Sequence, residues 1–363
     1  DGERRSARES PPQESSAAMS GSITSTQKFT VACVLTLATS SQGLLTTASK
    51  TNGVYLYNFA TVPLLSEMAK LAVSCLLLYR AVKLEPKTQI TCEWRSIALF
   101  TVPSFIYLIH NNVQFMLLKY VDPSTYQILG NLKIVTTGVL FRLLLRRQLS
   151  KLQWIALVLL TIGATTSQVQ GCEDHEFAAP VTGYLLGLVS ACLSALAGVY
   201  TEYIMKKNED NLYWQNVQLY GFGVVFNALR LIYDDVNVGF QQGFTLFPSV
   251  LLRGYDGVTW LVVMNLAFSG LLVSWIQKYA DTIVKVYSTS MAMLVTMVLS
   301  VVFFHLAPTL QLILGIMIAS ASLQLYYIHP SDLLPDGGKE KEALEQPLVG
   351  IKVDEMVSDD KAS

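Results

Sequence analysis

Two lysines lie in stretches of the chain that are otherwise apolar. Lys133 has no acidic residue three or four positions away, and Lys285 has only Asp281, four residues before it. An ammonium group in an apolar medium costs about 3 kcal/mol or more unless it is paired or faces water. A phosphate or carboxylate of a ligand would satisfy both charges, so the sequence predicts an anion-binding site. Lys285 has two alternatives: a pair with Asp281, or an extended side chain that reaches the polar boundary.

The stretches around these lysines are rich in tyrosine, amide and hydroxyl side chains. Residues four or seven positions apart share one face of a helix. Amides and tyrosines can hydrogen-bond a base and hydroxyl groups, and tyrosine rings can stack on planar groups. The alternative is hydrogen bonding between helices, worth only about 0.6–2 kcal/mol per contact. The shared faces combine Tyr107 with Asn111, Tyr126 with Lys133, and Asn216 with Tyr220.

Other ionisable residues in apolar stretches have partners close by in the sequence. Glu67 and Lys70 are three residues apart and can pair, so a structural and a functional role are equally open. Glu202 and Lys206 are four residues apart, which favours a local ion pair or a gate contact at least as much as ligand binding. A lone histidine such as His110 is more often a hydrogen-bonded packing residue than a proton carrier.

Signatures of catalysis and of metal binding are absent from the sequence. It contains no G-x-S-x-G, no H-E-x-x-H, no phosphate-binding P-loop, and no D-x-D on a predicted lumenal loop. The five cysteines form no C-x-x-C pair. We therefore expect neither an enzyme nor a resident cofactor or metal.

The composition indicates the class of protein that holds these residues. The 363 residues are 52% apolar and only 15% charged, whereas a soluble domain has about 25% charged residues. Of the 53 charged residues, 21 lie in the terminal stretches 1–28 and 329–363. These numbers exclude collagen, coiled coils, disulfide scaffolds and basic nucleic-acid binders, and they favour a multispanning membrane protein with polar tails.

An apolar span across a bilayer needs about 20 helical residues. The sequence between the tails accommodates ten such spans, which predicts an all-α polytopic protein embedded in lipid. A count of nine is the alternative, since the first, fifth and tenth spans are short or polar. The expected spans are 29–47, 57–79, 96–118, 123–145, 153–170, 180–205, 213–233, 255–276, 282–304 and 309–328.

The loop charges predict the orientation of these spans. With the N-terminus in the cytosol, eleven basic residues fall in cytosolic loops and four in lumenal loops. The positive-inside rule therefore places both termini in the cytosol. Acidic residues of the lumenal loop 171–180 agree with this orientation. The eleven are Arg80, Lys83, Lys87, Arg95, Arg142, Arg146, Arg147, Lys151, Lys206, Lys207 and Lys278.

Ten spans can be two sets of five. The fourth span opens near Asp122 and leads to Leu152 and Gln153, and the ninth opens near Asp281 and leads to Leu310 and Gln311. A unit with an odd number of crossings must repeat in inverted orientation, which is a recurring plan of transporters. The predicted organisation is a disordered cytosolic tail (1–28), a transporter domain (29–328) with halves of about 29–170 and 180–328, and an acidic disordered cytosolic tail (329–363).

Several short motifs together resemble the nucleotide-sugar transporter family of the drug/metabolite transporter superfamily. Within that family the sequence is most similar to the plant CMP-sialic acid transporter branch. Their number, order and spacing cover essentially residues 29–328. The motifs are YLIHNN (107–112), DPSTYQILGNLKI (122–134), LSKLQW (149–154), AGVYTE (197–202), NVQLY (216–220) and KYADTIVK (278–285).

The resemblance implies a ten-helix fold in the Golgi membrane. It also implies exchange of a cytosolic nucleotide sugar for a lumenal nucleoside monophosphate by alternating access. The cargo would be CMP-sialic acid or another CMP-linked acidic sugar, with CMP as the exchange partner. The lysines would hold phosphate and the acidic sugar, and the tyrosines and asparagines the base and ribose. The matching substrate-binding positions are Tyr107, Asn111, Tyr126, Lys133, Thr137, Ser194, Asn216, Tyr220 and Lys285. A homodimer is left open.

Two departures keep the cargo open. Phe222 and Gly223 stand where the animal CMP-sialic acid transporters have a Ser-Gly pair, and His110 stands where they have Gln. The alternatives are a UDP-sugar transporter, UDP-galactose-like, and a drug or metabolite exporter without nucleotide recognition. Two lysines favour a monophosphate over a diphosphate. A membrane glycosyltransferase or a scaffolding subunit is disfavoured by the nearly equal halves.

Overall fold

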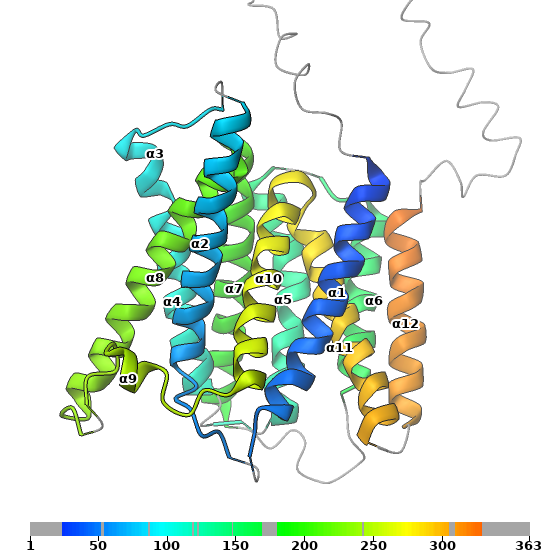
Figure 1. Cartoon of the computed structure of the whole chain (residues 1–363). Coiled ribbons are helices and arrows are strands. Elements are labelled where there is room, and N and C mark those ends of the chain that lie inside the picture. Colours follow the sequence, from blue (N-terminus) through cyan, green and yellow to red (C-terminus); the bar gives the residue numbers. More distant parts are fainter. Residues whose placement is uncertain are drawn as a thin grey trace, which may run out of the picture.

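The computed structural model describes residues 24–51, 54–85, 88–117, 120–121, 123–146, 148–168, 180–241, 243–304 and 309–328. Most of both expected tails and of the acidic loop 171–180 lies outside them. Within these ranges the chain is helical, apart from an isolated bridge between Thr51 and Val54 (Figure 1). The helices are α1 (Ser25–Ala48), α2 (Thr61–Leu84), α3 (Trp94–Leu99), α4 (Thr101–Leu117), α5 (Pro123–Leu144), α6 (Lys151–Thr166), α7 (Val181–Lys207), α8 (Leu212–Asn237), α9 (Pro248–Leu251), α10 (Gly257–Tyr279), α11 (Thr282–Phe304) and α12 (Leu310–Tyr327).

The long helices coincide with the ten expected spans, usually within a few residues. Six of them are long and apolar enough to cross a membrane, namely α1, α2, α7, α10, α11 and α12. The all-α prediction is therefore confirmed for the described residues, and the lengths and apolar character of these helices support a polytopic membrane protein. That ten helices cross the bilayer stays a prediction.

One expected span is divided. The predicted helix 96–118 appears as α3 and α4, which are separated at Phe100. Pro103 has no backbone N–H to donate to the carbonyl of Leu99, and its ring crowds that carbonyl. The helical hydrogen-bond ladder is therefore interrupted at this point, and the single-helix expectation is wrong here.

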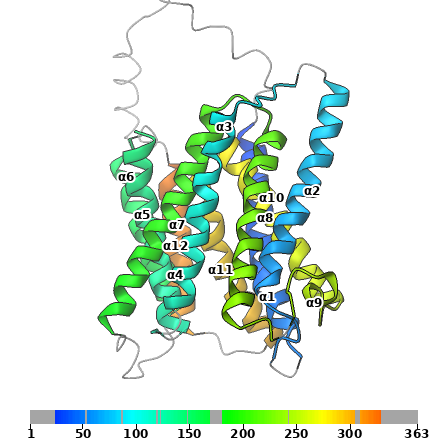
Figure 2. The ribbon, with the colours of Figure 1, turned by 90° about the vertical axis from the view of Figure 1, so that its left-hand side faces the viewer.

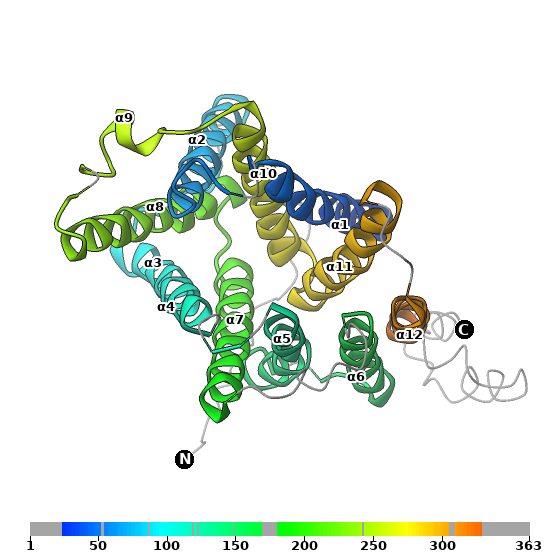
Figure 3. The same ribbon diagram turned by 90° about the horizontal axis from the view of Figure 1, so that it is seen from below.

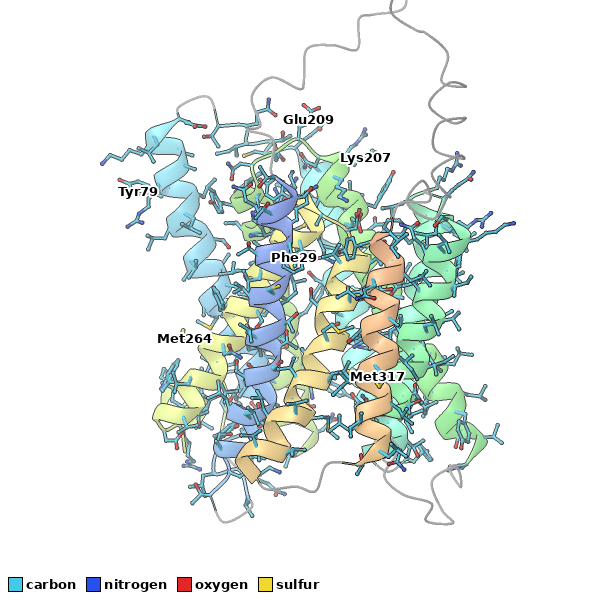
Figure 4. The ribbon with its side chains drawn as sticks, turned by 90° about the vertical axis from the view of Figure 1, so that its right-hand side faces the viewer. Phe29, Tyr79, Lys207, Glu209, Met264 and Met317 are labelled. Atoms are coloured by element: carbon cyan, nitrogen blue, oxygen red, sulfur yellow. The ribbon has the colours of Figure 1, made fainter. Side chains whose placement is uncertain are left out.

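The outer surface of the bundle is apolar along its length, and charged side chains lie at its ends. Phe29, Met264 and Met317 extend outward from α1, α10 and α12, and Met317 is 63% exposed. Lys207 and Glu209 lie at the end of the bundle where α2 also ends (Figure 4). Large apolar side chains facing outward over helix-length distances are typical of contact with lipid.

The helices surround a centre to which several of them contribute. Viewed along the bundle, α6 and α12 lie at one end of the cross-section and α8 with α9 at the other (Figure 3). In contact pairs, α1 packs on α10 and α11, α7 on α4 and α5, α2 on α8, and α6 on α12. Figure 2 shows α7 and α4 side by side along most of their length.

The α6–α12 pair depends on two glycines that let the backbones approach closely. A Cβ atom added to Gly163 would lie 2.9 Å from the Gly315 carbonyl oxygen, and one added to Gly315 would lie 2.7 Å from the Gly163 carbonyl oxygen. Small residues of this kind are what membrane helices use for close packing.

Replacing Gly163 by Ala should therefore destabilise the protein by about 1–3 kcal/mol, because the new methyl group meets backbone atoms that cannot yield. The measurement is the thermal unfolding temperature in detergent. Gly221→Ala is the matched control, since a Cβ there meets nothing within 4 Å. Equal unfolding temperatures for the two variants would contradict the close approach of α6 and α12.

Candidate functional site

Two cavities lie side by side inside the bundle. The first, of about 230 Å³, is lined mainly by α2, α4, α8 and α10. It combines aromatic rings with charged groups, which makes it suitable for a planar polar ligand. Its most informative lining residues are Glu67, Lys70, Tyr107, Tyr220, Phe226 and Arg230.

The second cavity, of about 170 Å³, lies between α4, α5 and α7, with Met293 of α11 completing the wall. Among the residues that the structure describes, its polar lining combines one ammonium group with hydroxyl, amide and imidazole groups and contains no carboxylate. A wall of this composition complements an anion that also carries hydroxyl groups. The polar lining residues are His110, Gln114, Tyr126, Lys133, Ser190 and Ser194.

The two predicted lysines lie beside different cavities. The Lys285 ammonium donates to the Tyr107 hydroxyl at 3.4 Å, and Tyr107 lines the first cavity. Lys133 lines the second cavity together with His110, which lies one helical turn beyond Tyr107 on α4. Lys133 and Lys285 are near enough for their like charges to interact.

Neither of these ammonium groups has a carboxylate within ion-pair distance in the described part of the chain. For Lys285 the expected alternative was Asp281, but the Asp281 carboxylate lies 3.0 Å from the Lys206 ammonium. The structure thus gives the anion-binding interpretation of Lys133 and Lys285 its electrostatic basis.

Lys206 forms the centre of a second polar cluster, which we call the Lys206 clasp. Its ammonium lies 2.6 Å from the Glu202 carboxylate on α7 and also bonds the Ala280 carbonyl and Asp281. The second Glu202 oxygen accepts from the Thr282 N–H at 2.6 Å. The expected local Glu202–Lys206 pair is present, and it ties α7 to the junction of α10 and α11.

The Glu67–Lys70 pair is also present, with 2.6 Å between the ammonium and the carboxylate. The Lys70 ammonium lies 4.5 Å from the centre of the Tyr220 ring, so the pair belongs to the wall of the first cavity. Gly223 and Gly270 make room for it, because a Cβ at either position would lie within 3 Å of the Glu67 or Lys70 side chain. Glu67 and Lys70 were absent from the predicted site, although their spacing in an apolar stretch was a usable signal.

Arg230 is a further lining residue that was not predicted as part of the site. It lines the first cavity, with its Nε 3.7 Å from the Asp234 carboxylate of the next turn. The sequence suggested only that Arg230 is a loop-side charge, since it lies near the expected end of its span. Helix α8 extends to Asn237 and brings this side chain into the bundle.

The nine predicted site residues divide into three groups. Five of them line a cavity: Tyr107 and Tyr220 the first, and Tyr126, Lys133 and Ser194 the second. Lys285 reaches Tyr107. The third group is Asn111, Thr137 and Asn216, and neither Thr137 nor Asn216 is among the described lining residues of either cavity.

Thr137 is buried, and its hydroxyl donates to the Lys133 carbonyl of its own helix at 2.6 Å. Asn216 is 2% exposed, and its side-chain oxygen finds no hydrogen-bond partner among the described residues. The side chain of Asn111 lies outside the described residues. A role of these three in binding stays a prediction.

Comparisons with known proteins agree with the sequence motifs. Residues 23–327 match a family described as nucleotide-sugar transporter. A protein of Oryza sativa subsp. japonica named CMP-sialic acid transporter 1 is 61% identical over 306 residues, which is 83% of this chain and 94% of that protein. CMP-sialic acid transporter 1 of Arabidopsis thaliana is 56% identical over 341 residues, which is 92% of this chain and all of that protein.

One solved crystal structure shares the fold. It superposes with a TM-score of 0.61 and 15% sequence identity, and the match covers 84% of this chain and 98% of the other. At this identity the likeness concerns fold alone.

Removing the Glu67 carboxylate should leave the Lys70 ammonium in the cavity wall without its partner. Glu67→Gln is expected to destabilise the protein by about 2 kcal/mol. The double variant Glu67→Gln/Lys70→Met removes both charges and should recover much of the loss. Unfolding temperatures in detergent test this, and a double variant no more stable than the single would contradict the pairing.

Proposed function

The chain belongs to the nucleotide-sugar transporter family, and we propose that it exchanges cytosolic CMP-sialic acid, or another CMP-linked acidic sugar, for lumenal CMP. The observation that carries this proposal is a pair of ammonium groups, Lys133 and Lys285, without carboxylate partners in the described residues. Lys133 lines the second cavity, and Lys285 bonds Tyr107 in the wall of the first. Named relatives at 56% and 61% identity support the choice of CMP-linked cargo.

The arrangement of the cavities suggests how such a substrate lies. The aromatic first cavity, with Tyr107, Tyr220 and Phe226, receives the nucleoside. The phosphate lies beside Lys285 and Lys133, where ammonium groups bind it as point charges. The second cavity then receives the acidic sugar. The order nucleoside, phosphate and sugar follows the order of the two cavities and the lysines between them.

We further propose that the ten long helices form two inverted five-helix repeats. The first repeat contains α1, α2, α3 with α4, α5 and α6, and the second contains α7, α8, α10, α11 and α12. The contacts of α1 with α10 and α11 then correspond to those of α7 with α4 and α5. Helix α2 corresponds to α8 and α6 to α12 in this scheme, and both of these pairs are in contact. This correspondence supports the repeat proposal.

A repeated tetrapeptide supports the same relation. Lys119-Tyr120-Val121-Asp122 precedes α5, and Lys278-Tyr279-Ala280-Asp281 precedes α11. Inverted repeats place these two junctions on opposite faces of the membrane. In the second junction, Ala280 and Asp281 are held by the Lys206 clasp.

The contacts between the repeats differ at the two junctions. Helix α7 packs against both α10 and α11, whereas no comparable contact joins α1 to α4 or α5 in the part of the chain that the structure describes. We interpret this asymmetry as one closed face, held by the Lys206 clasp, in a transporter that works by alternating access. The positive-inside rule makes the clasp face cytosolic, together with both termini. A Golgi location is part of the proposal.

Counterflow into liposomes preloaded with CMP tests the proposed exchange. Wild-type protein should take up CMP-sialic acid, and Lys133→Ala and Lys285→Ala should each lower the rate at least tenfold, because one charge-assisted bond to the phosphate is worth about 1.5–3 kcal/mol. Their unfolding temperatures should stay near the wild-type value. Lys207→Ala is the control, since Lys207 is exposed and bonds only Tyr203 among the described residues.

Wild-type exchange in both lysine variants would contradict the proposed phosphate contacts. Competition by CMP, UMP and GMP in the same assay separates the cargo alternatives. Stronger competition by UMP would favour a UDP-sugar transporter, and no competition by any of the three would favour an exporter without nucleotide recognition.

Lys206→Ala should favour the state in which the cytosolic face is open. Without Lys206, closing this face would bury the Glu202 carboxylate without a cation. In protein whose native cysteines have been replaced, a cysteine introduced at Ser274, in the wall of the first cavity, should react faster with a membrane-impermeant thiol reagent added from the cytosolic side. Lys207→Ala should not change that rate. Unchanged labelling in Lys206→Ala would show that the clasp does not hold this face closed.

A further inference from the structure

We propose that His110 determines specificity for the sugar, by binding the acidic sugar part of the substrate in the second cavity. The proposal rests on the proposed function, since it requires a nucleotide-linked acidic sugar as cargo. Two observations carry it: the way the imidazole ring is held, and the composition of the cavity that it lines.

The ring of His110 is fixed by a neighbouring helix. His110 is 8% exposed, and its Nδ1 lies 3.4 Å from the Ser190 hydroxyl of α7. Either atom of this contact can be the donor, depending on which ring nitrogen carries the proton. No other described side chain is hydrogen-bonded to the ring, so Nε2 is available to a ligand. His110 and Ser190 both line the second cavity.

The second cavity differs from the first in the partners of its charged groups. In the wall of the first, Lys70 is already paired with the Glu67 carboxylate, and Arg230 lies 3.7 Å from the Asp234 carboxylate. The second contains the Lys133 ammonium and the hydroxyl groups of Tyr126 and Ser194, and its lining includes no acidic side chain among the residues that the structure describes. A sugar that carries both a carboxylate and hydroxyl groups therefore fits the second cavity and can hydrogen-bond the His110 ring.

Tyr107 and His110, three residues apart on α4, would contact different parts of the substrate. Tyr107 lines the first cavity and His110, three residues later, lines the second. The charged groups that act on His110 are Lys133 from α5 and Lys285 from α11. A phosphate held by these lysines would place the sugar beside His110 and the nucleoside beside Tyr107. His110 thus contributes to recognition of the sugar and not of the nucleoside monophosphate.

The experiment compares two ligands in the same variants. The affinity for CMP is measured by its thermal stabilisation of the purified protein, and the KM for CMP-sialic acid by counterflow into CMP-loaded liposomes. His110→Ala should raise the KM for CMP-sialic acid about tenfold and leave the CMP affinity within about twofold. His110→Gln, whose amide can donate at a similar reach, should recover part of the loss. Ser190→Ala should act in the same direction as His110→Ala, but less strongly.

A purely structural role of His110 would weaken CMP and CMP-sialic acid equally, and this result would overturn the proposal. An unchanged KM for CMP-sialic acid in His110→Ala would overturn it as well. These outcomes are distinguishable from failure of the proposed function, in which the wild-type protein itself neither binds CMP nor transports a CMP-linked sugar.

Discussion

The cost of placing an ammonium group in a low-dielectric medium is the constraint on which the rest of this structure depends. The chain has few charged residues between its tails, and each lysine inside the bundle must be satisfied by a carboxylate, by backbone carbonyls or by a ligand. Lys70 and Lys206 are satisfied by carboxylates of their own helices. Lys133 and Lys285 are not, in the described residues. Lys133 lies in the wall of the second cavity, and Lys285 bonds Tyr107 in the wall of the first.

Lysines that pair with a carboxylate of their own helix differ in role from lysines that lack such a partner. A lysine with a carboxylate one turn away is neutralised whenever its helix forms, so it can strengthen a wall or close a junction without a ligand. The Lys206 clasp adds the Ala280 carbonyl and Asp281 to such a pair and so connects α7 to the start of α11. A lysine without such a neighbour keeps its electrostatic cost until an anion arrives. Relief of this cost would therefore contribute to the binding free energy of an anionic cargo.

The sequence was sufficient for the positions of the long helices and for five residues that line the cavities, because both depend on local patterns. Apolar length predicted the spans, and charge spacing separated Lys133 and Lys285 from the paired lysines. The pattern could not tell which neighbouring helix a given face meets. Thr137 shares the span of Lys133 but bonds its own backbone, while Arg230, expected near a loop, enters the first cavity. The break at Phe100 was local, and Pro103 was its overlooked signal.

The same electrostatics gives a physical reason why such a carrier would exchange cargo and not return empty. Lys133 lies on α5 and Lys285 on α11, two helices that contact one another and that are equivalent in the proposed repeats. In the empty carrier their like charges repel across this contact. A phosphate between them, as proposed, would convert the repulsion into two attractions and would lower the cost of bringing the two proposed repeats together. CMP and a CMP-linked sugar both carry that phosphate, so either would permit the conformational change, whereas the empty site would resist it.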